Sequence, residues 1–400
     1  MALDDSAMLR TRWLLDPAVA FLNHGSFGAC PIAVLDAQAA LRARLERQPV
    51  QFLARDLEGL LDDARAALGA FLGADPDDLA FVPNATTGVN AVLRSLRLGP
   101  GDDLLTTDHA YGACRNTLAW VGERTGARVV VAAVPFPLDG PDAVSDAVLA
   151  AVTPRTRLAL LDHVTSATGL VFPIARLIAA LAERGIDTLV DGAHAPGMLP
   201  LDLRALGAAY YAGNCHKWLC APKGAGFLHV RRDRQQGIHP TTISHGLTVA
   251  RTDRSRFRLE FDWTGTTDPT AWLCVPEAIR HVGSFVPGGW DEIRSRNHAL
   301  VLAARARVAA ALGTALPCPD EMIGSLAALP FPDGSPEPPQ SALYSDPAQD
   351  ALLGRFGIEV PIYPWPAPSR RFLRLSAHLY NTAADYERLA AALPAIVAAR

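Results

Sequence analysis

One lysine of this sequence stands in a setting that suits covalent chemistry. Lys217 lies in the run 213–219 (G-N-C-H-K-W-L) and is followed by A-P-K-G-A-G and an apolar run. An apolar environment lowers the pKa of a lysine, and the neutral amine can then form Schiff bases. Taken alone, the pattern fits an ordinary surface lysine better than a catalytic one.

Two further segments carry residues that could bind a phosphorylated ring. Asp191 ends the apolar run 187–191, where a buried carboxylate is costly unless it meets a cation such as a protonated pyridine nitrogen; a helix-capping role fits equally well. The run 84–88 (N-A-T-T-G) opens a helical pattern, and such an N-terminus can bind phosphate, with a plain threonine cap as the equal alternative. The order phosphate site, acid, lysine indicates pyridoxal 5'-phosphate as the cofactor.

The elements that must position these residues alternate along the middle of the chain. Short apolar runs predict strands at 79–83, 102–107, 128–134, 157–164, 187–191, 209–213 and 226–230. Helical patterns lie between them at 84–96, 114–122 and 174–185. This alternation predicts an α/β protein with a mainly parallel sheet covered on both faces. Ligands of such sheets bind beyond the carboxyl ends of the strands.

The flanking segments predict two smaller parts of the molecule. An amphipathic helical arm covers about 32–72, and a helix at 290–312 is followed by strands near 324–328, 359–363 and 372–376. We therefore expect an N-terminal arm with helices (1–72) that packs with the small domain, a large cofactor-binding domain (73–285) and a small C-terminal domain (286–400). The polar, proline-rich run 333–339 predicts a loop.

The composition disfavours several classes of protein. The 400 residues carry 37 basic and 41 acidic side chains, a net charge of −4, which disfavours binding to nucleic acid or to anionic membranes. Apolar runs are interrupted before the roughly 20 residues of a membrane span. The acidic N-terminus does not resemble a signal peptide, so we expect a cytoplasmic protein. Six cysteines without a C-x-x-C pair predict reduced thiols and no metal site.

Four motifs in this order carry a family resemblance: T-T-G, D-G-A-H-A-P-G, G-N-C-H-K-W-L and, near the end, R-L-S-A-H-L-Y-N-T. From about residue 13 to 398 the sequence resembles the class V aminotransferase group of fold-type I pyridoxal-phosphate enzymes. The resemblance implies a large domain with a mainly parallel seven-stranded sheet flanked by helices, and a smaller α/β C-terminal domain. It also implies a homodimer with shared active sites.

The resemblance also implies roles for individual residues. Lys217 would form the Schiff base with the cofactor and move the Cα proton, and Asp191 would keep the pyridine nitrogen protonated. His109 would stack on the ring, although Tyr111 could do the same. The remaining residues assigned to the cofactor are Thr86, Thr87, Ser166, His194, Asn214, His216 and, donated across the dimer interface, Thr266.

Substrate binding is assigned to a second group of residues. Arg374 lies between two leucines on an otherwise apolar predicted strand, and its guanidinium suits a substrate carboxylate. The resemblance places the carboxylate-binding arginine at this position. Asn23, His24 and Ser26 of the opening run L-N-H-G-S-F-G would line the substrate entrance.

The reaction is less specified than the cofactor. A carbanion at Cα of an amino acid can be reprotonated on either face, can be protonated on the cofactor or can expel a leaving group. The opening run resembles the epimerase and C–S lyase side of the group, so we expect epimerisation at Cα. A C–S β-lyase acting on a cysteine S-conjugate, and an aminotransferase, stay as alternatives. A cysteine desulfurase of this group needs a thiol in a mobile loop shortly before the carboxylate-binding arginine, and no cysteine follows Cys318, so persulfide chemistry there is disfavoured. Lys217, Asp191 and Arg374 disfavour a non-catalytic binding protein.

Overall fold

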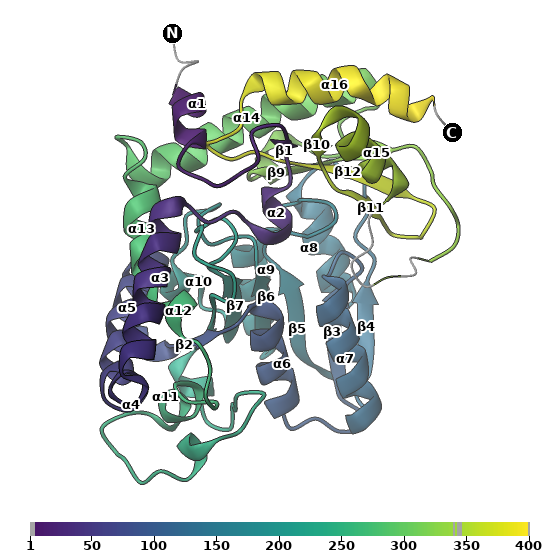
Figure 1. Cartoon of the computed structure of the whole chain (residues 1–400). Coiled ribbons are helices and arrows are strands. Elements are labelled where there is room, and N and C mark those ends of the chain that lie inside the picture. The colour runs from purple at the N-terminus through teal and green to yellow at the C-terminus, as the bar shows by residue number, and fades with distance from the viewer. Residues whose placement is uncertain (1–4, 339–340, 342–345, 399–400) are drawn as a thin grey trace.

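A seven-stranded sheet forms the centre of the computed structural model, which describes residues 5–338, 341 and 346–398 (Figure 1). The seven strands are β2 Leu79–Val82, β3 Asp103–Thr107, β4 Arg128–Ala132, β5 Thr156–Asp162, β6 Asp187–Gly192, β7 Tyr210–Asn214 and β8 Gly226–Val230. Their order is β2-β8-β7-β6-β5-β3-β4. Strand β8 runs antiparallel to β2 and β7, and the other pairs are parallel. Every strand predicted for this sheet is confirmed.

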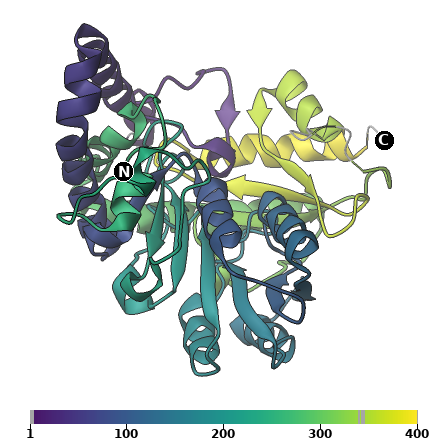
Figure 2. The ribbon, with the colours of Figure 1, turned by 90° about the horizontal axis from the view of Figure 1, so that it is seen from below.

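Helices cover both faces of the sheet (Figure 2). They are α6 Ala85–Ser95, α7 Gly112–Thr125, α8 Pro141–Ala150, α9 Ile174–Ala182 and α10 Leu203–Leu206. Neighbouring strand residues point to opposite faces, so Leu104 packs in the core under α6 and α7 while Leu105 packs in the core under α8 and α9. Burial on both faces explains why the strands read as continuous apolar runs.

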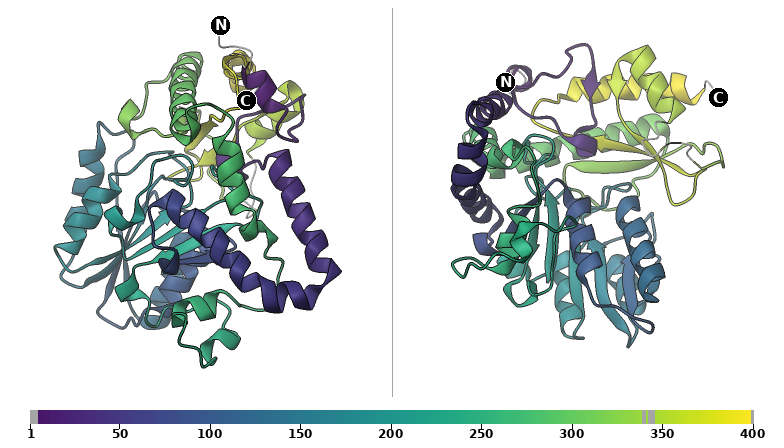
Figure 3. Two further views of the ribbon diagram at one scale, coloured as in Figure 1. Left: turned by 90° about the vertical axis from the view of Figure 1, so that its left-hand side faces the viewer. Right: turned by 60° about the horizontal axis from the view of Figure 1, so that its bottom comes forward.

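The N-terminal helical arm stands along one flank of the molecule (Figure 3). It is made of α3 Ile32–Arg47, α4 Pro49–Gln51, a π-helical turn Phe52–Asp56 and α5 Leu57–Leu72. The arm is interrupted where Pro49, which has no backbone N–H, begins a new helix. Helices α3 and α5 pack against α12 Thr270–Leu273 and α13 Val275–Gly283.

The C-terminal part forms a second α/β layer above the main sheet in Figure 1. Its antiparallel sheet has the order β11-β12-β9, from Ile362–Pro364, Arg371–Ser376 and Leu326–Phe331. Helices α14 Gly289–Leu312, α15 Pro347–Phe356 and α16 Ala383–Val397 complete it. The predicted strand at 359–363 is divided, because β10 Ile358–Glu359 pairs instead with the N-terminal β1 Ala20–Phe21. This pairing joins the opening segment of the chain to the C-terminal part.

The remaining elements are short. They are α1 Asp5–Arg10, α2 His24–Phe27, α11 Arg256–Phe261 and the 3₁₀ turns Pro76–Asp78, Arg232–Arg234, His245–Leu247 and Asp320–Met322. The predicted loop at 333–339 is irregular over 333–338, and Pro339 lies outside the described residues. None of the described helices combines the length and the apolar character that crossing a bilayer requires. The division into domains at 72 and 285 stays a prediction.

Candidate active site

A cavity of about 230 Å³ lies beyond the carboxyl ends of the parallel strands. Its wall combines loops that follow β2, β3, β5, β6 and β7 with the N-terminal turn α2. The predicted site residues that line it are Ser26, Thr86, Ser166, Asp191, His194, Asn214, His216 and Lys217. The fold therefore gathers residues from segments that are far apart in the sequence.

The Lys217 amine faces a hydrogen-bond donor inside this cavity. The indole N–H of Trp218 donates to Nδ1 of His194 at 3.3 Å. A neutral His194 then carries its proton on Nε2, which lies 3.2 Å from Nζ of Lys217. Burial, followed by the positive charge of Arg374, lowers the pKa of Lys217 to about 7. The amine can therefore accept this hydrogen bond in its neutral, nucleophilic form.

Asp191 lies at the end of β6 on the floor of the cavity and is 3% exposed. Its carboxyl accepts hydrogen bonds from the Cys114 thiol at 3.1 Å and from the backbone N–H of Ala193 at 3.0 Å. Burial raises the pKa of Asp191, and these two donors and Lys217 oppose that rise. A protonated pyridine nitrogen would supply the cation that this acid needs.

The N-terminus of α6 forms the anion-binding end of the cavity. The side-chain oxygen of Asn84 accepts from the backbone N–H and the hydroxyl of Thr87, and Asn214 accepts from the backbone N–H of Ala85 at 2.8 Å. These bonds fix the first turn of the helix, where backbone amides and the helix dipole favour a phosphate. Thr86 lines the cavity, whereas Thr87 supports the turn from behind.

His216 and Thr266 were also assigned to phosphate. His216 lines the cavity and donates through Nδ1 to the carbonyl of Ala225 at 2.9 Å, which leaves Nε2 for a ligand. Burial, followed by the charge of Lys217, lowers its pKa to about 4. Thr266 lies exposed in the loop between α11 and α12, away from the cavity of its own chain. Its donation to a second subunit stays a prediction.

The structure separates the two candidates for ring stacking. His109 donates from Nε2 to the carbonyl of Val134 at 3.1 Å and accepts through Nδ1 from Thr168 at 2.8 Å. It is buried beside Trp365 and outside the cavity lining. Tyr111 lines the cavity instead, so the geometry favours Tyr111 over His109 for the stacking role.

Arg374 is a buried cation on β12 without an acidic partner among the described residues. Its guanidinium donates to the carbonyl of Ser166 at 2.7 Å, to the hydroxyl of Ser26 at 3.0 Å and to Tyr363 at 3.3 Å. Its Nε has no hydrogen-bond partner there. A buried, incompletely satisfied guanidinium is suited to a carboxylate ligand.

Asn23 and His24 do not lie at the substrate entrance as expected. Asn23 is buried behind Ser26, whose hydroxyl donates to its side-chain oxygen at 2.5 Å. His24 is fully buried and outside the cavity lining. Its Nε2 donates to the backbone carbonyl of Lys217 at 3.0 Å, and its Nδ1 accepts from Tyr380 at 2.8 Å. Both residues therefore support site residues from behind, and Ser26 alone faces the cavity.

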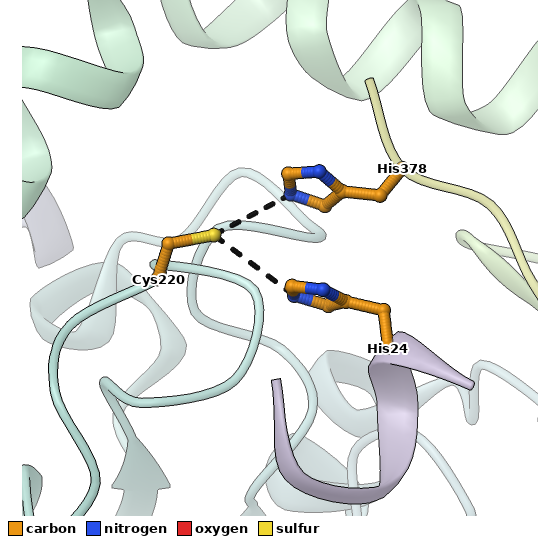
Figure 4. Close-up of side chains that lie close together, drawn as sticks. All are labelled: His24, Cys220 and His378. Carbon is orange, nitrogen blue, oxygen red and sulfur yellow. Dashed lines mark hydrogen bonds between the residues drawn. The ribbon is translucent and has the colours of Figure 1, made fainter. Parts of the chain in front are cut away.

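His24, Cys220 and His378 form a buried cluster (Figure 4). The Cys220 sulfur lies 3.5 Å from Nε2 of His378 and 3.9 Å from Nε2 of His24. Two histidines and a cysteine could ligate zinc. However, the carbonyl of Lys217 can only accept, so Nε2 of His24 carries a proton and has no lone pair for a metal. We interpret the cluster as hydrogen-bonded support for the Lys217 segment.

Gly28 is the last residue of the opening run L-N-H-G-S-F-G, and its position requires a glycine. It has φ 72°, and a Cβ at this position would lie 2.1 Å from the carbonyl oxygen of His216 and 2.9 Å from Cα of Lys217. Any larger residue would displace the lysine backbone. The N-terminal segment is therefore packed directly on the chain that carries the amine.

Sequence reasoning missed three groups that shape the site: Tyr363 beside Arg374, Trp218 as the donor to His194, and Asp162 on the cavity floor. Their contacts join distant segments, and no local pattern marks them. The scarcity of lysine is a signal that points to Lys217, because Lys217 and Lys223 are the only lysines of the sequence. A chain that otherwise uses arginine for its basic residues has a specific reason to keep a lysine.

Strand ends that join a neutral lysine, a buried acid and a helix N-terminus define the cofactor site of a fold-type I pyridoxal-phosphate enzyme. The class V aminotransferase model ("Aminotransferase class-V") matches residues 31–389. Isopenicillin N epimerase of Amycolatopsis lactamdurans is 38% identical over 410 residues, which cover 96% of this chain and 99% of the relative. L-cysteine desulfhydrase of Arabidopsis thaliana is 28% identical over 414 residues, which cover 95% and 88%.

A solved structure supports the same fold. The cystine C–S lyase C-DES, in complex with cysteine persulfide, superposes with a TM-score of 0.75 at 23% identity and covers 94% of this chain and 97% of that chain. The chain belongs to the class V aminotransferase family. Its cofactor is pyridoxal 5'-phosphate, which fits a wall that offers a neutral amine, a buried acid without an ion pair to the described residues and a helix N-terminus.

The cofactor-free protein should capture pyridoxal phosphate faster as the pH rises through about 7, because only neutral Lys217 attacks the aldehyde. Absorbance after mixing measures this rate, and borohydride reduction with peptide mapping identifies the labelled lysine. Lys223→Arg should leave rate and label unchanged. A label on Lys223, or a midpoint near the ordinary lysine value of about 10.4, would contradict the assignment.

Proposed function

We propose that this protein inverts the configuration at Cα of an α-amino acid, in the manner of isopenicillin N epimerase. The main observation in support of this proposal is that Lys217 and Tyr111 enter the cavity from opposite flanks of Asp191. Lys217 follows β7, Tyr111 precedes α7 after β3, and β6 and β5 lie between these strands. Inversion needs one group that removes a proton and a second that returns it from the other side. The similarity to isopenicillin N epimerase over nearly the whole chain supports the same reading.

The proposal gives the groups that line the cavity the following tasks. Pyridoxal phosphate, when bound, delocalises the negative charge that develops at Cα. Neutral Lys217 removes the Cα proton, and Asp191 holds a positive charge on the ring nitrogen. The N-terminus of α6 binds the phosphate. Arg374 fixes the substrate by its α-carboxylate, which orients the Cα–H bond toward the lysine.

Tyr111 is the proton donor on the second flank. A tyrosine phenol is protonated at neutral pH. Burial, followed by Cys114 and Asp191, raises the pKa of Tyr111 further, so the group has a proton to donate. Tyr111 is 46% exposed at the mouth of the cavity. It can therefore exchange its proton with water after each turnover.

A C–S β-lyase is the second candidate, and the similarity to L-cysteine desulfhydrase supports it. Elimination begins with the same removal of the Cα proton by Lys217. It differs afterwards, because a sulfur leaving group departs from Cβ and no proton has to arrive on the opposite face. The two candidates therefore differ in their need for Tyr111.

The candidates can be separated with one panel of amino acids and cysteine S-conjugates. In D₂O the loaded protein should exchange the Cα proton and invert chirality without releasing pyruvate. Mass spectrometry, chiral chromatography and a pyruvate assay measure the three outcomes together. Pyruvate without inversion would replace epimerisation by β-elimination, and a keto acid formed with aminated cofactor would indicate transamination.

Tyr111→Phe should slow inversion by at least about tenfold, because a general acid typically contributes about a hundredfold or more. Exchange at the face served by Lys217 should change much less. His109→Gln is the matched control, since His109 lies outside the cavity, and it should lower thermal stability without separating exchange from inversion. Equal losses of exchange and inversion in Tyr111→Phe would remove Tyr111 from the proton donor role.

Arg374→Ala should weaken substrate binding about tenfold to a hundredfold, because a hydrogen bond between charged groups contributes about 1.5–3 kcal/mol. Arg374→Lys should recover part of the loss, and cofactor content should be unchanged. Arg370→Ala serves as the control, because the side chain of Arg370 is exposed. The Michaelis constants of amino acids and their decarboxylated amines provide the measurement, and equal constants in the unmodified protein would exclude an α-amino acid substrate.

A further inference from the structure

A second buried acid stands on the floor of the cofactor cavity. Asp162 ends β5 and lies directly across from Asp191 in the register of β5 and β6. It is 2% exposed and lines the cavity. None of the roles assigned above uses this carboxyl.

The hydrogen bonds of the two acids are unequal. Asp191 accepts from Cys114 and from the backbone of Ala193. The Oδ2 atom of Asp162, in contrast, has no hydrogen-bond partner among the residues that the structure describes. Two adjacent buried carboxyls cannot both be ionised at low cost. Both oxygens of Asp191 accept a hydrogen bond from the described residues, whereas Oδ2 of Asp162 accepts none, so Asp191 keeps the charge.

The groups around Asp162 act on its pKa in both directions, and the net effect is a rise. Burial, followed by the charge of Asp191 on β6, raises the pKa of Asp162 well above its usual range. The backbone amides of Tyr111 and of Asp162 itself, and the charge of Arg115, oppose this rise only in part. Cys114 of α7 donates to Asp191 and not to Asp162.

We propose that Asp162 is held as a neutral carboxylic acid and that its O–H is a fixed hydrogen-bond donor in the cofactor cavity beside Asp191. Asp162 is then a positioning residue. It limits the floor of the cavity to one negative charge, which is the charge that a single pyridine nitrogen can balance. This role holds for any of the reactions considered above.

A neutral Asp162 has a measurable effect on stability. In the unfolded chain an aspartate ionises near pH 3.9, whereas Asp162 of the folded protein keeps its proton to a higher pH. Between the unfolded pKa and the folded pKa, the free energy of unfolding therefore falls as the pH rises. Asp162→Asn keeps a neutral donor and removes this loss. The variant should therefore unfold at a higher temperature than the unmodified protein, and the difference should widen from about pH 5 to about pH 8.

Asp103 offers a matched control with the opposite sign. It is a buried strand aspartate whose carboxylate pairs with Arg128 at 2.6 Å. The hydrogen bond from Arg128 is the largest cause that lowers its pKa to about 2. Its contribution is present above the unfolded pKa and is lost as the pH falls through about 2, so Asp103→Asn should lower the unfolding temperature at both pH values.

The experiment uses the full chain loaded with pyridoxal phosphate and compares the unmodified protein, Asp162→Asn, Asp162→Leu and Asp103→Asn. Unfolding temperature, cofactor affinity and the cofactor absorbance are measured. Asp162→Asn should keep the affinity, whereas Asp162→Leu, which has no donor, should lose about tenfold, equivalent to one hydrogen bond. A lower unfolding temperature of Asp162→Asn at about pH 8, or a loss of affinity equal to that of Asp162→Leu, would overturn the proposal.

Infrared spectroscopy provides an independent measurement if Asp162→Asn fails to fold. The unmodified protein should show the carbonyl band of a protonated carboxylic acid, and this band should be absent from Asp162→Leu. A spectrum of the unmodified protein without that band would show that Asp162 is ionised and would refute the proposal.

Discussion

An amine that must stay uncharged inside a protein constrains most of this structure. A neutral Lys217 amine can accept a hydrogen bond, and Nε2–H of His194 can donate it. Trp218 places the proton of His194 on Nε2 by donating to Nδ1. The lysine backbone must also be held still, and His24 and Gly28 of the N-terminal segment do this by a hydrogen bond and by close packing. The opening segment is in turn anchored to the C-terminal part through the pairing of β1 with β10.

The same site concentrates opposite charges at places where the fold can tolerate them. Asp191 lies near the end of the central strand β6, where a thiol and a backbone amide donate to it, and Asp162 lies across from it on β5. The cation Arg374 lies on the other sheet, held by neutral oxygens of Ser166, Ser26 and Tyr363. An amino acid placed between them would satisfy the guanidinium with its carboxylate. A bound carboxylate and a protonated pyridine nitrogen would complete a charge arrangement that the described residues leave open.

The sheet could be predicted from sequence because strands buried on both faces read as short apolar runs between helices. The motifs around Asp191 and Lys217 were equally local. Side-chain direction in loops is not encoded locally, and for this reason the sequence alone favours His109 over Tyr111 and predicts His24 at the entrance. Asp162 and Tyr363 could not be predicted, since their roles arise from strand register and from contacts between the two sheets. The two-residue β1 is too short to leave a pattern.

The scarcity of lysine has a consequence for the chemistry of the whole molecule. The cofactor is an aldehyde that condenses with any accessible primary amine. This chain offers two lysine amines, one in the cavity wall and one bonded to the carbonyl of Gly28, and all its other basic side chains except histidine are guanidiniums, which do not form stable imines under these conditions. Nearly the entire surface is therefore inert toward aldehydes. Excess cofactor therefore finds few amines with which it could form an imine.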